Sequence, residues 1–179
     1  FDVTIRLPDG TLVDPGEQGE IVVTTRFLGA LTRGYLGNPA ATAQALRQGA
    51  FHTGDYGSWD AAGHVYFHGR MSDSARVNGE NVSAFEVESV AGKHPAVEDC
   101  AMVAVAAEIG EQDIKLFVKP KPGSVIDPAE LSAWLQSRLA GYQRPRYIAV
   151  IAEFERTPSQ RIMKHRLSKR IDDAWDRGR

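Results

Sequence analysis

The feature that most constrains the fold is a change of residue pattern near Gly69. Before it, short runs of β-branched and aromatic residues alternate with turns that contain Gly and Pro, which is typical of a small β-rich unit. After it, apolar runs of strand length alternate with stretches whose apolar residues recur every three or four positions, which predicts helices packed on a sheet. We therefore expect an α+β chain whose two domains meet near Gly69-Arg70.

In the first seventy residues the pattern predicts three strands and one short helix. A turn at Pro8-Asp9-Gly10 ends the first strand, because Gly adopts positive φ without strain. The helix is expected to begin at Pro39, since proline suits the first helical turn. The strands are expected at residues 3–7, 20–24 and 64–68, and the helix at 39–46.

In the second part the pattern predicts a three-stranded sheet flanked by helices, with a core of its own. Asp127-Pro128 is a helix start signal, because Asp caps free backbone amides and proline suits the first helical position. A basic tail is compatible with a further helix. The strands are expected at 97–107, 114–118 and 147–151, the helices at 84–93 and 128–139, and the tail at 164–175.

The composition excludes several classes of protein. Of 179 residues, 42% are hydrophobic and 25% are charged, which excludes a disordered polyampholyte. No apolar run approaches the roughly 20 residues that cross a bilayer, so we expect no membrane span and a cytoplasmic location. The single cysteine, Cys100, excludes a disulfide framework and a Cys-rich zinc site. The five histidines lack metal-ligand spacing, so no metal site is expected.

The charge is unevenly distributed. From Arg138 to the last residue, 11 basic and 5 acidic residues give a local net charge of +6, whereas the rest carries −8. A basic terminal segment favours a phosphate-bearing partner, either nucleic acid or a nucleotide. Asp172, Asp173 and Asp176 interrupt the positive segment, and no RNA-binding aromatic motif or helix-turn-helix is present. We therefore expect no nucleic-acid partner and favour a nucleotide.

Several short motifs follow one another in a fixed order. They are Gly19-Glu20, GYLGNP at 34–39 with Thr42, FHTGD at 51–55, Gly69-Arg70, NGEN at 78–81 and TPSQRI at 157–162. Each one alone is weak, but together they resemble the adenylate-forming family of acyl-activating enzymes, which includes acyl-CoA synthetases, firefly luciferase and peptide-synthetase adenylation domains. The resemblance covers nearly the whole chain.

The resemblance implies a domain organisation. Family members have a large N-terminal domain with a Gly/Ser/Thr-rich phosphate loop and most of the acyl pocket, and neither lies in this chain. Residues 1–69 would then be the last β-rich subdomain of that large domain, 70–73 a hinge, and 74–179 the mobile C-terminal domain. The chain would be inactive alone, with the missing N-terminal domain as its partner.

The resemblance also implies an activity, that of an ATP-dependent acyl-CoA synthetase. A carboxylate attacks the α-phosphate of Mg-ATP to give acyl-AMP and pyrophosphate, and CoA then displaces AMP. The expected ligands are ATP, Mg²⁺, CoA and a small carboxylic acid. Ser72 and residues 79–81 favour CoA ligases of the crotonobetaine or carnitine and aromatic-acid kind. The alternatives are a weakened or non-catalytic nucleotide-binding member and a carrier-protein-directed adenylation enzyme.

Two residues resemble the nucleotide-binding pair of the family, and two others resemble its hinge. Asp55 matches the carboxylate that binds the ribose hydroxyls of ATP, and a carboxylate can accept hydrogen bonds from two neighbouring hydroxyls. Arg70 would add a charge-assisted contact to the same ribose. Ser72 matches the hinge position, where family members usually have Asp or Lys, and Asp73 follows it. A turn aspartate and a surface ion pair are the local alternatives.

Four residues resemble the loop that lines the pantetheine tunnel of CoA. They are Asn78, Gly79, Glu80 and Asn81. Glycine suits this role, because a missing side chain lets the backbone approach a thin thiol arm. The local sequence alone is equally compatible with an Asn-Gly hairpin turn.

Tyr142 and Arg144 match positions that contact the CoA nucleotide in some acyl-CoA ligases. Arginine can both stack on a base and pair with a phosphate. Ile109 replaces an aromatic residue that is common in those ligases. For Tyr142, core packing is the alternative.

The TPSQRI segment departs from the family's Thr-Pro-Ser/Thr-Gly-Lys-Ile pattern. Gln160 replaces Gly, and Arg161 replaces the catalytic lysine. Arginine keeps the charge, but its planar guanidinium is larger and prefers a bidentate contact. We expect Arg161 to take the catalytic position, and Lys164 to match a second basic position. Slow adenylation with normal transfer to CoA, or nucleotide binding without ligation, are the alternatives.

Overall fold

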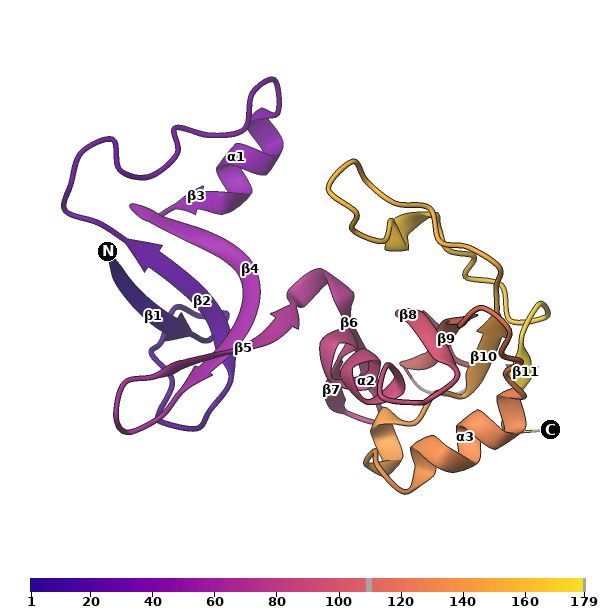
Figure 1. Cartoon of the computed structure of the whole chain (residues 1–179). Coiled ribbons are helices and arrows are strands. Elements are labelled where there is room, and N and C mark those ends of the chain that lie inside the picture. The colour runs from indigo at the N-terminus through magenta and orange to yellow at the C-terminus, as the bar shows by residue number, and fades with distance from the viewer. Residues whose placement is uncertain (109–110, 179) are drawn as a thin grey trace. The chain divides into compact units, whose positions relative to one another are not determined.

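The computed structural model describes residues 1–108 and 111–178, and it divides the chain into two compact units (Figure 1). The first unit is Phe1–Ser72 and the second is Asp73–Arg179. The fold class is α+β, as the sequence predicted. Among the described residues, no helix is long and apolar enough to span a membrane.

The first unit is built on an antiparallel sheet with the order β1-β2-β4-β3, in which β5 also pairs with β4. The expected strands and the helix are present, but the sequence missed β4, the longest strand of this sheet. Its glycines and polar residues interrupt the alternation that marks a strand. The elements are β1 (Asp2–Arg6), β2 (Gly19–Thr24), α1 (Pro39–Ala45), β3 (Leu46–Arg47), β4 (Ala50–Trp59) and β5 (Val65–Arg70).

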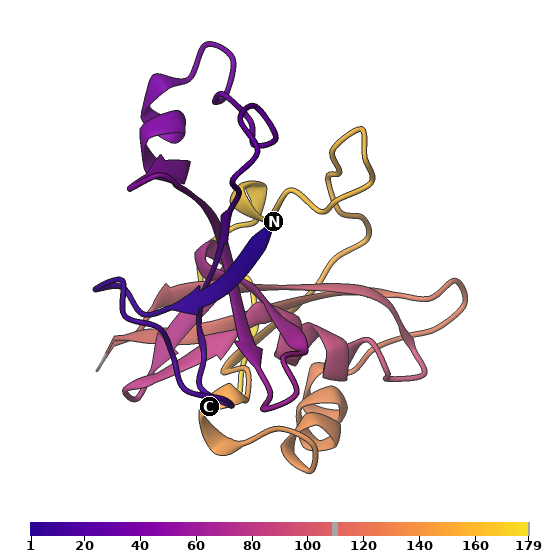
Figure 2. The ribbon, with the colours of Figure 1, turned by 90° about the vertical axis from the view of Figure 1, so that its left-hand side faces the viewer.

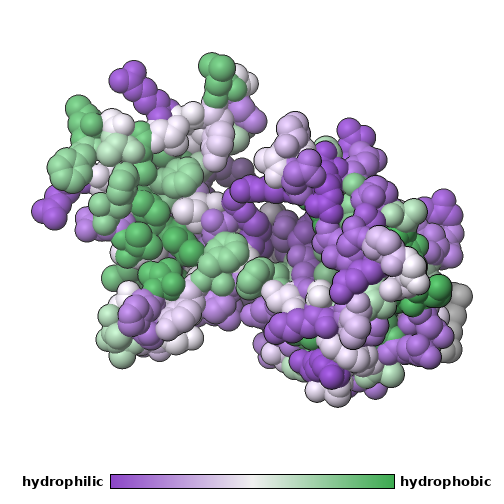
Figure 3. All heavy atoms as spheres, in the orientation of Figure 1, coloured by the Kyte–Doolittle hydropathy of each residue, from purple (hydrophilic) through white to green (hydrophobic). Residues whose placement is uncertain are grey.

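The first unit buries little apolar surface. Among its described residues the buried hydrophobic side chains are Ile5, Val13, Val22 and Ala50. A larger number of big apolar side chains are exposed, and Figure 3 shows hydrophobic surface gathered over part of this unit. They are Phe1, Val3, Leu7, Leu12, Phe27, Leu28, Tyr35, Leu36, Val65, Tyr66 and Phe67.

The second unit contains a four-stranded sheet with the order β11-β10-β9-β8. Strand β9 pairs antiparallel with β8 and parallel with β10, and the crossover between β9 and β10 contains α3. The fourth strand, β11, was not predicted because two residues carry no periodic pattern. A separate hairpin precedes the sheet. The strands are β6 (Ser74–Val77), β7 (Glu80–Ser83), β8 (Val97–Ala106), β9 (Gln112–Pro120), β10 (Tyr147–Val150) and β11 (Trp175–Asp176).

Both predicted helices of this unit begin at side-chain caps. The Ser83 side chain accepts a hydrogen bond from the amide of Phe85 at the start of α2 (Ala84–Ala91). Asp127 Oδ1 accepts one from Ala129 N, 2.8 Å away, at the start of α3 (Pro128–Gln136). These caps satisfy amides that have no partner inside the helix. The α3 start therefore lies where the sequence placed it, and its end lies three residues earlier than expected.

The two faces of the sheet are covered differently. Cys100, Met102, Ile114 and Leu116 face a core that contains α2 and α3. The alternate residues of the same strands face a second core, which includes Phe154 and the partly buried Ile162, Leu167, Ile171 and Ala174 of the C-terminal segment. Figure 2 shows α3 on one side of the long β8–β9 ribbon and the gold part of the chain that follows β10 on the other.

The tail at residues 164–175 is not an α-helix, although the sequence was compatible with one. Only Lys164–Arg166 forms a 3₁₀ turn, η3. The buried Lys115 of β9 explains the difference, because its Nζ donates to the carbonyl oxygens of Ser168 and Arg170 and to Asp173. In an α-helix those carbonyls would accept bonds from amides four residues further on. The ammonium takes them instead, and the segment runs irregularly across the sheet.

Lys115 is fully buried, and its ammonium also lies 4.5 Å from the centre of the Phe117 ring. A buried cation is stable only when charge and hydrogen-bond partners replace water. Here two carbonyls, one carboxylate and one ring face do so. The contact with Lys115 holds the pKa of Asp173 below its ordinary value. Lys115 is therefore an internal anchor for residues 168–173.

We predict that Lys115→Met lowers the free energy of unfolding by about 1–3 kcal/mol, because two carbonyl oxygens lose their buried donor. The segment after Leu167 should also become more sensitive to protease. Urea unfolding and limited proteolysis measure the two effects. Lys121→Met, at an exposed position of the same unit, is the control and should change stability by less than about 0.5 kcal/mol. Equal stability of both variants would show that Lys115 is no anchor.

Candidate functional site

The FHTGD motif lies at a bulge in the middle of β4. Val22 of β2 pairs with His52, and Glu20 pairs with Tyr56, so residues 53–55 all lie opposite Ile21. Gly54 has φ +70°, a conformation that favours glycine. Bulges turn a strand and re-aim its side chains, and they are common beside functional sites.

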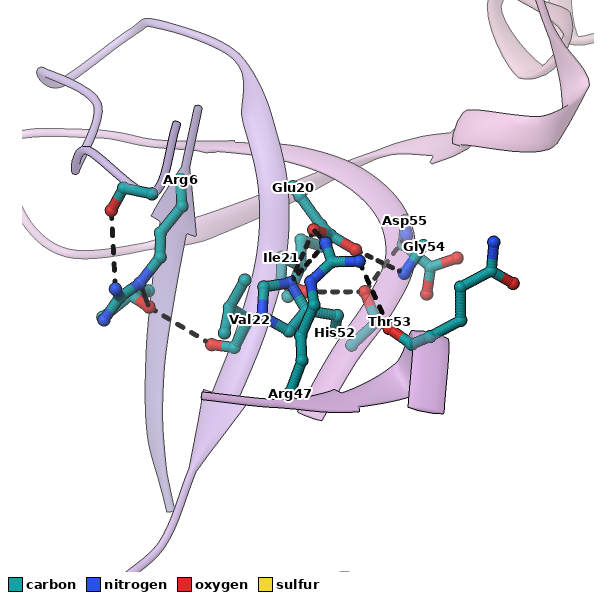
Figure 4. Close-up of polar contacts among 12 residues, drawn as sticks. Arg6, Glu20, Ile21, Val22, Arg47, His52, Thr53, Gly54 and Asp55 are labelled. Carbon is teal, nitrogen blue, oxygen red and sulfur yellow. Dashed lines mark hydrogen bonds and ion pairs between the residues drawn. The ribbon is translucent and has the colours of Figure 1, made fainter. Parts of the chain in front are cut away.

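Side chains replace the ladder hydrogen bonds that the bulge disrupts (Figure 4). Thr53 Oγ1 donates to the carbonyl of Ile21, 2.7 Å away, and accepts a bond from the amide of Asp55 at 3.1 Å. The amide of Gly54 donates to Glu20 Oε1 at 3.1 Å. The bulge is thus fixed by two side chains rather than by a regular ladder.

Asp55 and Arg70, the predicted nucleotide-binding pair, are brought together across two strands. They are direct partners in the β4–β5 register. Arg70 Nε lies 2.9 Å from Asp55 Oδ1, and Arg70 Nη1 donates to the carbonyl of Thr53 at 3.2 Å. The Asp55 side chain is 22% exposed and that of Arg70 is 51% exposed. The pair is therefore oriented by the protein and still open to solvent.

Asn78 and Gly79 form the hairpin turn that the local sequence allowed. Both have positive φ, 51° and 83°, and Val77 pairs with Glu80 across the two-residue loop. This geometry matches a type I′ turn, whose backbone twist suits a β-hairpin. The Gly79 amide donates to Glu111 Oε2 at 3.3 Å. The exposed loop is thus held in one conformation.

The other members of the predicted CoA set lie on neighbouring segments. Glu80 and Asn81 are exposed residues of β7, which contacts the 3₁₀ turn η2 (Gly141–Gln143). Tyr142, on that turn, is 37% exposed. The position of Ile109 lies outside the described residues.

Arg144 has a structural contact that the sequence did not predict. Its Nε donates to the carbonyl of Leu139 at 3.1 Å, and its Nη2 donates to the carbonyl of Gln136 at 2.9 Å. The Gln136 carbonyl lies at the C-terminal end of α3, where no intrahelical donor is available, and the Leu139 carbonyl lies three residues beyond it. Part of the Arg144 guanidinium therefore caps a helix.

Residues 156–162 form a tight turn that presents Arg161 to solvent. Arg156 and Ile162 are bridged, the amide of Thr157 donates to the carbonyl of Arg161 at 2.8 Å, and the amide of Arg161 donates back to Thr157 Oγ1 at 3.1 Å. Gln160 has φ +65°, and its carbonyl accepts a bond from Arg156 Nη1 at 2.9 Å. Gln160 thus has a left-handed backbone at the position where the family pattern has glycine, and residues 156–162 still form a turn.

Asp73 of the predicted hinge is linked to the segment after this turn. Lys164 Nζ lies 3.1 Å from Asp73 Oδ2 and 2.8 Å from Glu88 Oε1. The same Glu88 oxygen accepts a bond from the amide of Met102 at 2.6 Å. Burial raises the pKa of Glu88, and the nearby Lys164 opposes that rise. Ser72 lies in the 3₁₀ turn η1 (Met71–Asp73).

The sequence did not reveal this Lys164 link. Glu88 lies 76 residues before Lys164 in the sequence, and neither residue belongs to a recognisable pair.

Cys100 is buried, and its Sγ donates to the carbonyl of Glu88 at 3.4 Å. Burial, with the nearby charge of Glu88, raises the pKa of Cys100 to about 12, so the thiol is an inert core group. In the described part of the chain, no group of three or more His, Cys, Asp or Glu side chains could hold a metal ion.

Comparison with known proteins gives a consistent result. Residues 86–161 match the family model of the AMP-binding enzyme C-terminal domain. The chain is 39% identical over 170 residues to a feruloyl-CoA synthase of Amycolatopsis sp, covering 95% of this chain and 34% of the relative. It is 40% identical over 165 residues to a 2-succinylbenzoate--CoA ligase of Geobacillus kaustophilus, covering 92% of this chain and 33% of the relative.

A solved structure agrees with these relatives. The o-succinylbenzoate CoA synthetase MenE of Bacillus subtilis, in complex with its acyl-adenylate intermediate, has a TM-score of 0.82 and 27% identity, and the match covers 92% of this chain and 33% of that one. The same enzyme is also known in complex with ATP and magnesium.

Residues 86–161 therefore match the C-terminal domain of AMP-binding enzymes, and the fold of the chain is that of the MenE structure. The relatives of the chain are named CoA ligases and synthetases. The chain spans about a third of the length of the curated relatives it matches.

Because Gln160 has a left-handed backbone conformation, substitutions at this position should change the stability of the turn. Gln160→Val should lower the free energy of unfolding by about 1–2 kcal/mol, because a β-branched side chain is strained at positive φ. Gln160→Gly should change it by less than about 1 kcal/mol, since relief of strain is offset by the greater freedom of the unfolded chain. Urea unfolding measures both. Ser159→Val, at the neighbouring exposed position, is the control. A Gln160→Val protein as stable as the parent would contradict this geometry.

Proposed function

We propose that the chain is the C-terminal part of an AMP-forming acyl-CoA ligase. The whole enzyme would join a carboxylic acid to ATP, giving acyl-AMP and pyrophosphate, and would then transfer the acyl group to CoA with release of AMP. The observation that carries the proposal is the ion pair between Asp55 and Arg70 at the β4 bulge. The TPSQRI turn, in register with the family's catalytic segment, supports it.

In this proposal Asp55 binds the ribose of ATP. Its carboxylate can accept hydrogen bonds from two neighbouring hydroxyls, and the ion pair with Arg70 holds it in place. The 22% exposure of Asp55 leaves room for a ligand contact. Arg70 lies opposite Asp55 at the end of β5, is 51% exposed and would contact the ribose as well.

Arg161 is proposed as the cation that stabilises the adenylation transition state. It is exposed at its turn, and its side chain is a cationic guanidinium. A positioned cation lowers the energy of negative charge that develops on the phosphoryl group and the attacking carboxylate. Mg²⁺ would enter as part of the Mg-ATP substrate and neutralise phosphate charge.

Residues 70–73 are proposed as the hinge, with Ser72 as the pivot and Asp73 as the first residue of the moving unit. Hinges need a few residues that absorb changes of φ and ψ. The ion pair of Asp73 with Lys164 would keep the start of that unit and the Arg161 segment moving together.

The proposed CoA contacts are the turn at Asn78 and Gly79, the strand residues Glu80 and Asn81, and Tyr142. Their segments are in contact through β7 and η2. Arg144 would add a phosphate contact with the part of its guanidinium that does not cap α3. The relatives are named CoA ligases, which favours CoA over a carrier protein as acceptor.

The exposed apolar residues of the first unit support a protein partner. A contiguous apolar surface on a unit with so few buried side chains is typical of an interface. We propose that it packs on a preceding domain of the same enzyme.

Ferulate and 2-succinylbenzoate, the acids in the names of two relatives, are the first acyl substrates to test. The cytoplasmic location stays a prediction.

A second candidate, a nucleotide-binding protein with weakened ligation, is favoured by one observation. Arg161 and the left-handed Gln160 both depart from the family's catalytic pattern. An acyl-CoA ligase releases pyrophosphate when it is given ATP and its carboxylic acid, whereas the second candidate binds ATP and releases little or none.

We predict that Arg161→Ala in the whole enzyme lowers the rate of pyrophosphate release by about 100-fold, because a transition-state cation is lost. Transfer of the acyl group from preformed acyl-AMP to CoA should change little. Pyrophosphate release with ATP and a panel of carboxylic acids is the measurement. Arg166→Ala removes an exposed charge on η3 and serves as the control.

Two outcomes would contradict the proposal. If Arg161→Ala and the parent release pyrophosphate at the same rate, Arg161 has no catalytic role. If the parent enzyme binds ATP and releases no pyrophosphate with any acid, the second candidate is correct.

A further inference from the structure

The carboxylate of Glu20 lies beside the β4 bulge and receives three donors (Figure 4). Glu20 Oε1 accepts the amide of Gly54 at 3.1 Å. Glu20 Oε2 lies 2.8 Å from His52 Nδ1 and 3.1 Å from Arg47 Nη2. The Glu20 side chain is 13% exposed, and that of His52 is 11% exposed. Glu20 is thus a largely buried carboxylate whose two oxygens are both bound.

The bulge explains why a carboxylate is needed at this place. Three residues of β4 lie opposite the single residue Ile21, so the amide of Gly54 has no place in the regular β2–β4 ladder. A buried amide without an acceptor is unfavourable, and an ionised acceptor makes a stronger bond than a neutral one. Glu20 reaches this amide from β2, 34 positions earlier in the chain.

The amide that Glu20 holds belongs to the residue before Asp55. Gly54 has φ +70°, and a glycine can leave that conformation easily when nothing holds it. A change at Gly54 would displace Asp55 from its partner Arg70, whose Nε lies 2.9 Å from the carboxylate. The position of Asp55 therefore depends on a bond made one residue earlier.

The neighbours of Glu20 hold it in turn. His52 directly precedes the bulge, and Arg47 lies on β3, which pairs with the beginning of β4. Together they fix Glu20 Oε2, which leaves Oε1 directed at Gly54. The charge of Arg47 also offsets the charge of the largely buried Glu20.

We propose that Glu20 is a positioning residue for nucleotide binding, which acts on Asp55 through the amide of Gly54. The inference rests on the proposed function, because it assumes that Asp55 binds the ribose of ATP. Glu20 itself touches neither substrate nor reacting atoms. Its removal should therefore weaken ATP binding and leave the chemical step nearly unchanged.

The test measures the KM for ATP and the kcat of pyrophosphate release in the whole enzyme. Glu20→Ala should raise the KM for ATP by about tenfold and change kcat by less than about twofold. Glu20→Gln keeps an acceptor for Gly54 and should raise the KM by less than about threefold. Should Glu20→Ala fail to fold, His52→Ala removes one support of Glu20 and should raise the KM by about threefold.

Glu17→Ala is the matched control. The Glu17 carboxylate also accepts a backbone amide, that of Asp14 at 3.1 Å, in the same unit. Its removal changes the charge by the same amount, yet it should leave both kinetic constants unchanged.

A double-mutant cycle separates positioning from a general loss of structure. Asp55→Asn should raise the KM for ATP, and Glu20→Ala should add little in that background, because both changes remove the same contact. Fully additive effects would overturn the inference.

Two further outcomes distinguish the inference from the proposed function. A raised KM in Asp55→Asn with an unchanged KM in Glu20→Ala would overturn the role of Glu20 alone. An unchanged KM in Asp55→Asn would overturn the ribose site, and the role of Glu20 with it.

Discussion

The placement of the C-terminal segment in the second unit depends on the buried ammonium of Lys115. Of regular structure, the described residues 151–178 contain one 3₁₀ turn, one isolated bridge and the two-residue strand β11, so they have few backbone hydrogen bonds of their own. Lys115 binds this segment at three oxygens, while Leu167, Ile171 and Ala174 pack on the sheet around it. Lys164 then joins the segment to Asp73 and Glu88. The exposed Arg161 thus belongs to a segment that the contacts of Lys115 and Lys164 attach to the rest of the unit.

Several of the residues proposed to act on ligands lie where regular strand pairing is interrupted. Asp55 follows Gly54 in a bulge, Asn78 and Gly79 form a left-handed turn, and Arg161 follows the left-handed Gln160. Regular strands satisfy their own backbone groups and point side chains at the faces of the sheet, whereas bulges and turns expose a side chain at a chosen place. Side chains such as Glu20 and Thr53 then fix these irregular positions.

Local signals in the sequence predicted much of this architecture. The Asp127-Pro128 start of α3 and the apolar runs of β8 and β9 are signals of neighbouring residues, and both predictions were confirmed. Strand β4 was missed because the bulge breaks its pattern, and the tail was not helical because Lys115, more than fifty positions earlier, takes its carbonyls. The same holds for the candidate site. The resemblance to the family implied the pair Asp55 and Arg70, whereas the contact of Glu20 with Gly54 is visible only in the fold.

The central claim is that the Asp55–Arg70 pair at the β4 bulge binds the ribose of a nucleotide. A crystal structure of the whole enzyme with bound AMP tests it most directly. We predict that the Asp55 carboxylate accepts hydrogen bonds from the ribose hydroxyls, while Gly54 remains bonded to Glu20. A nucleotide bound elsewhere, with its ribose out of reach of Asp55, would contradict the account.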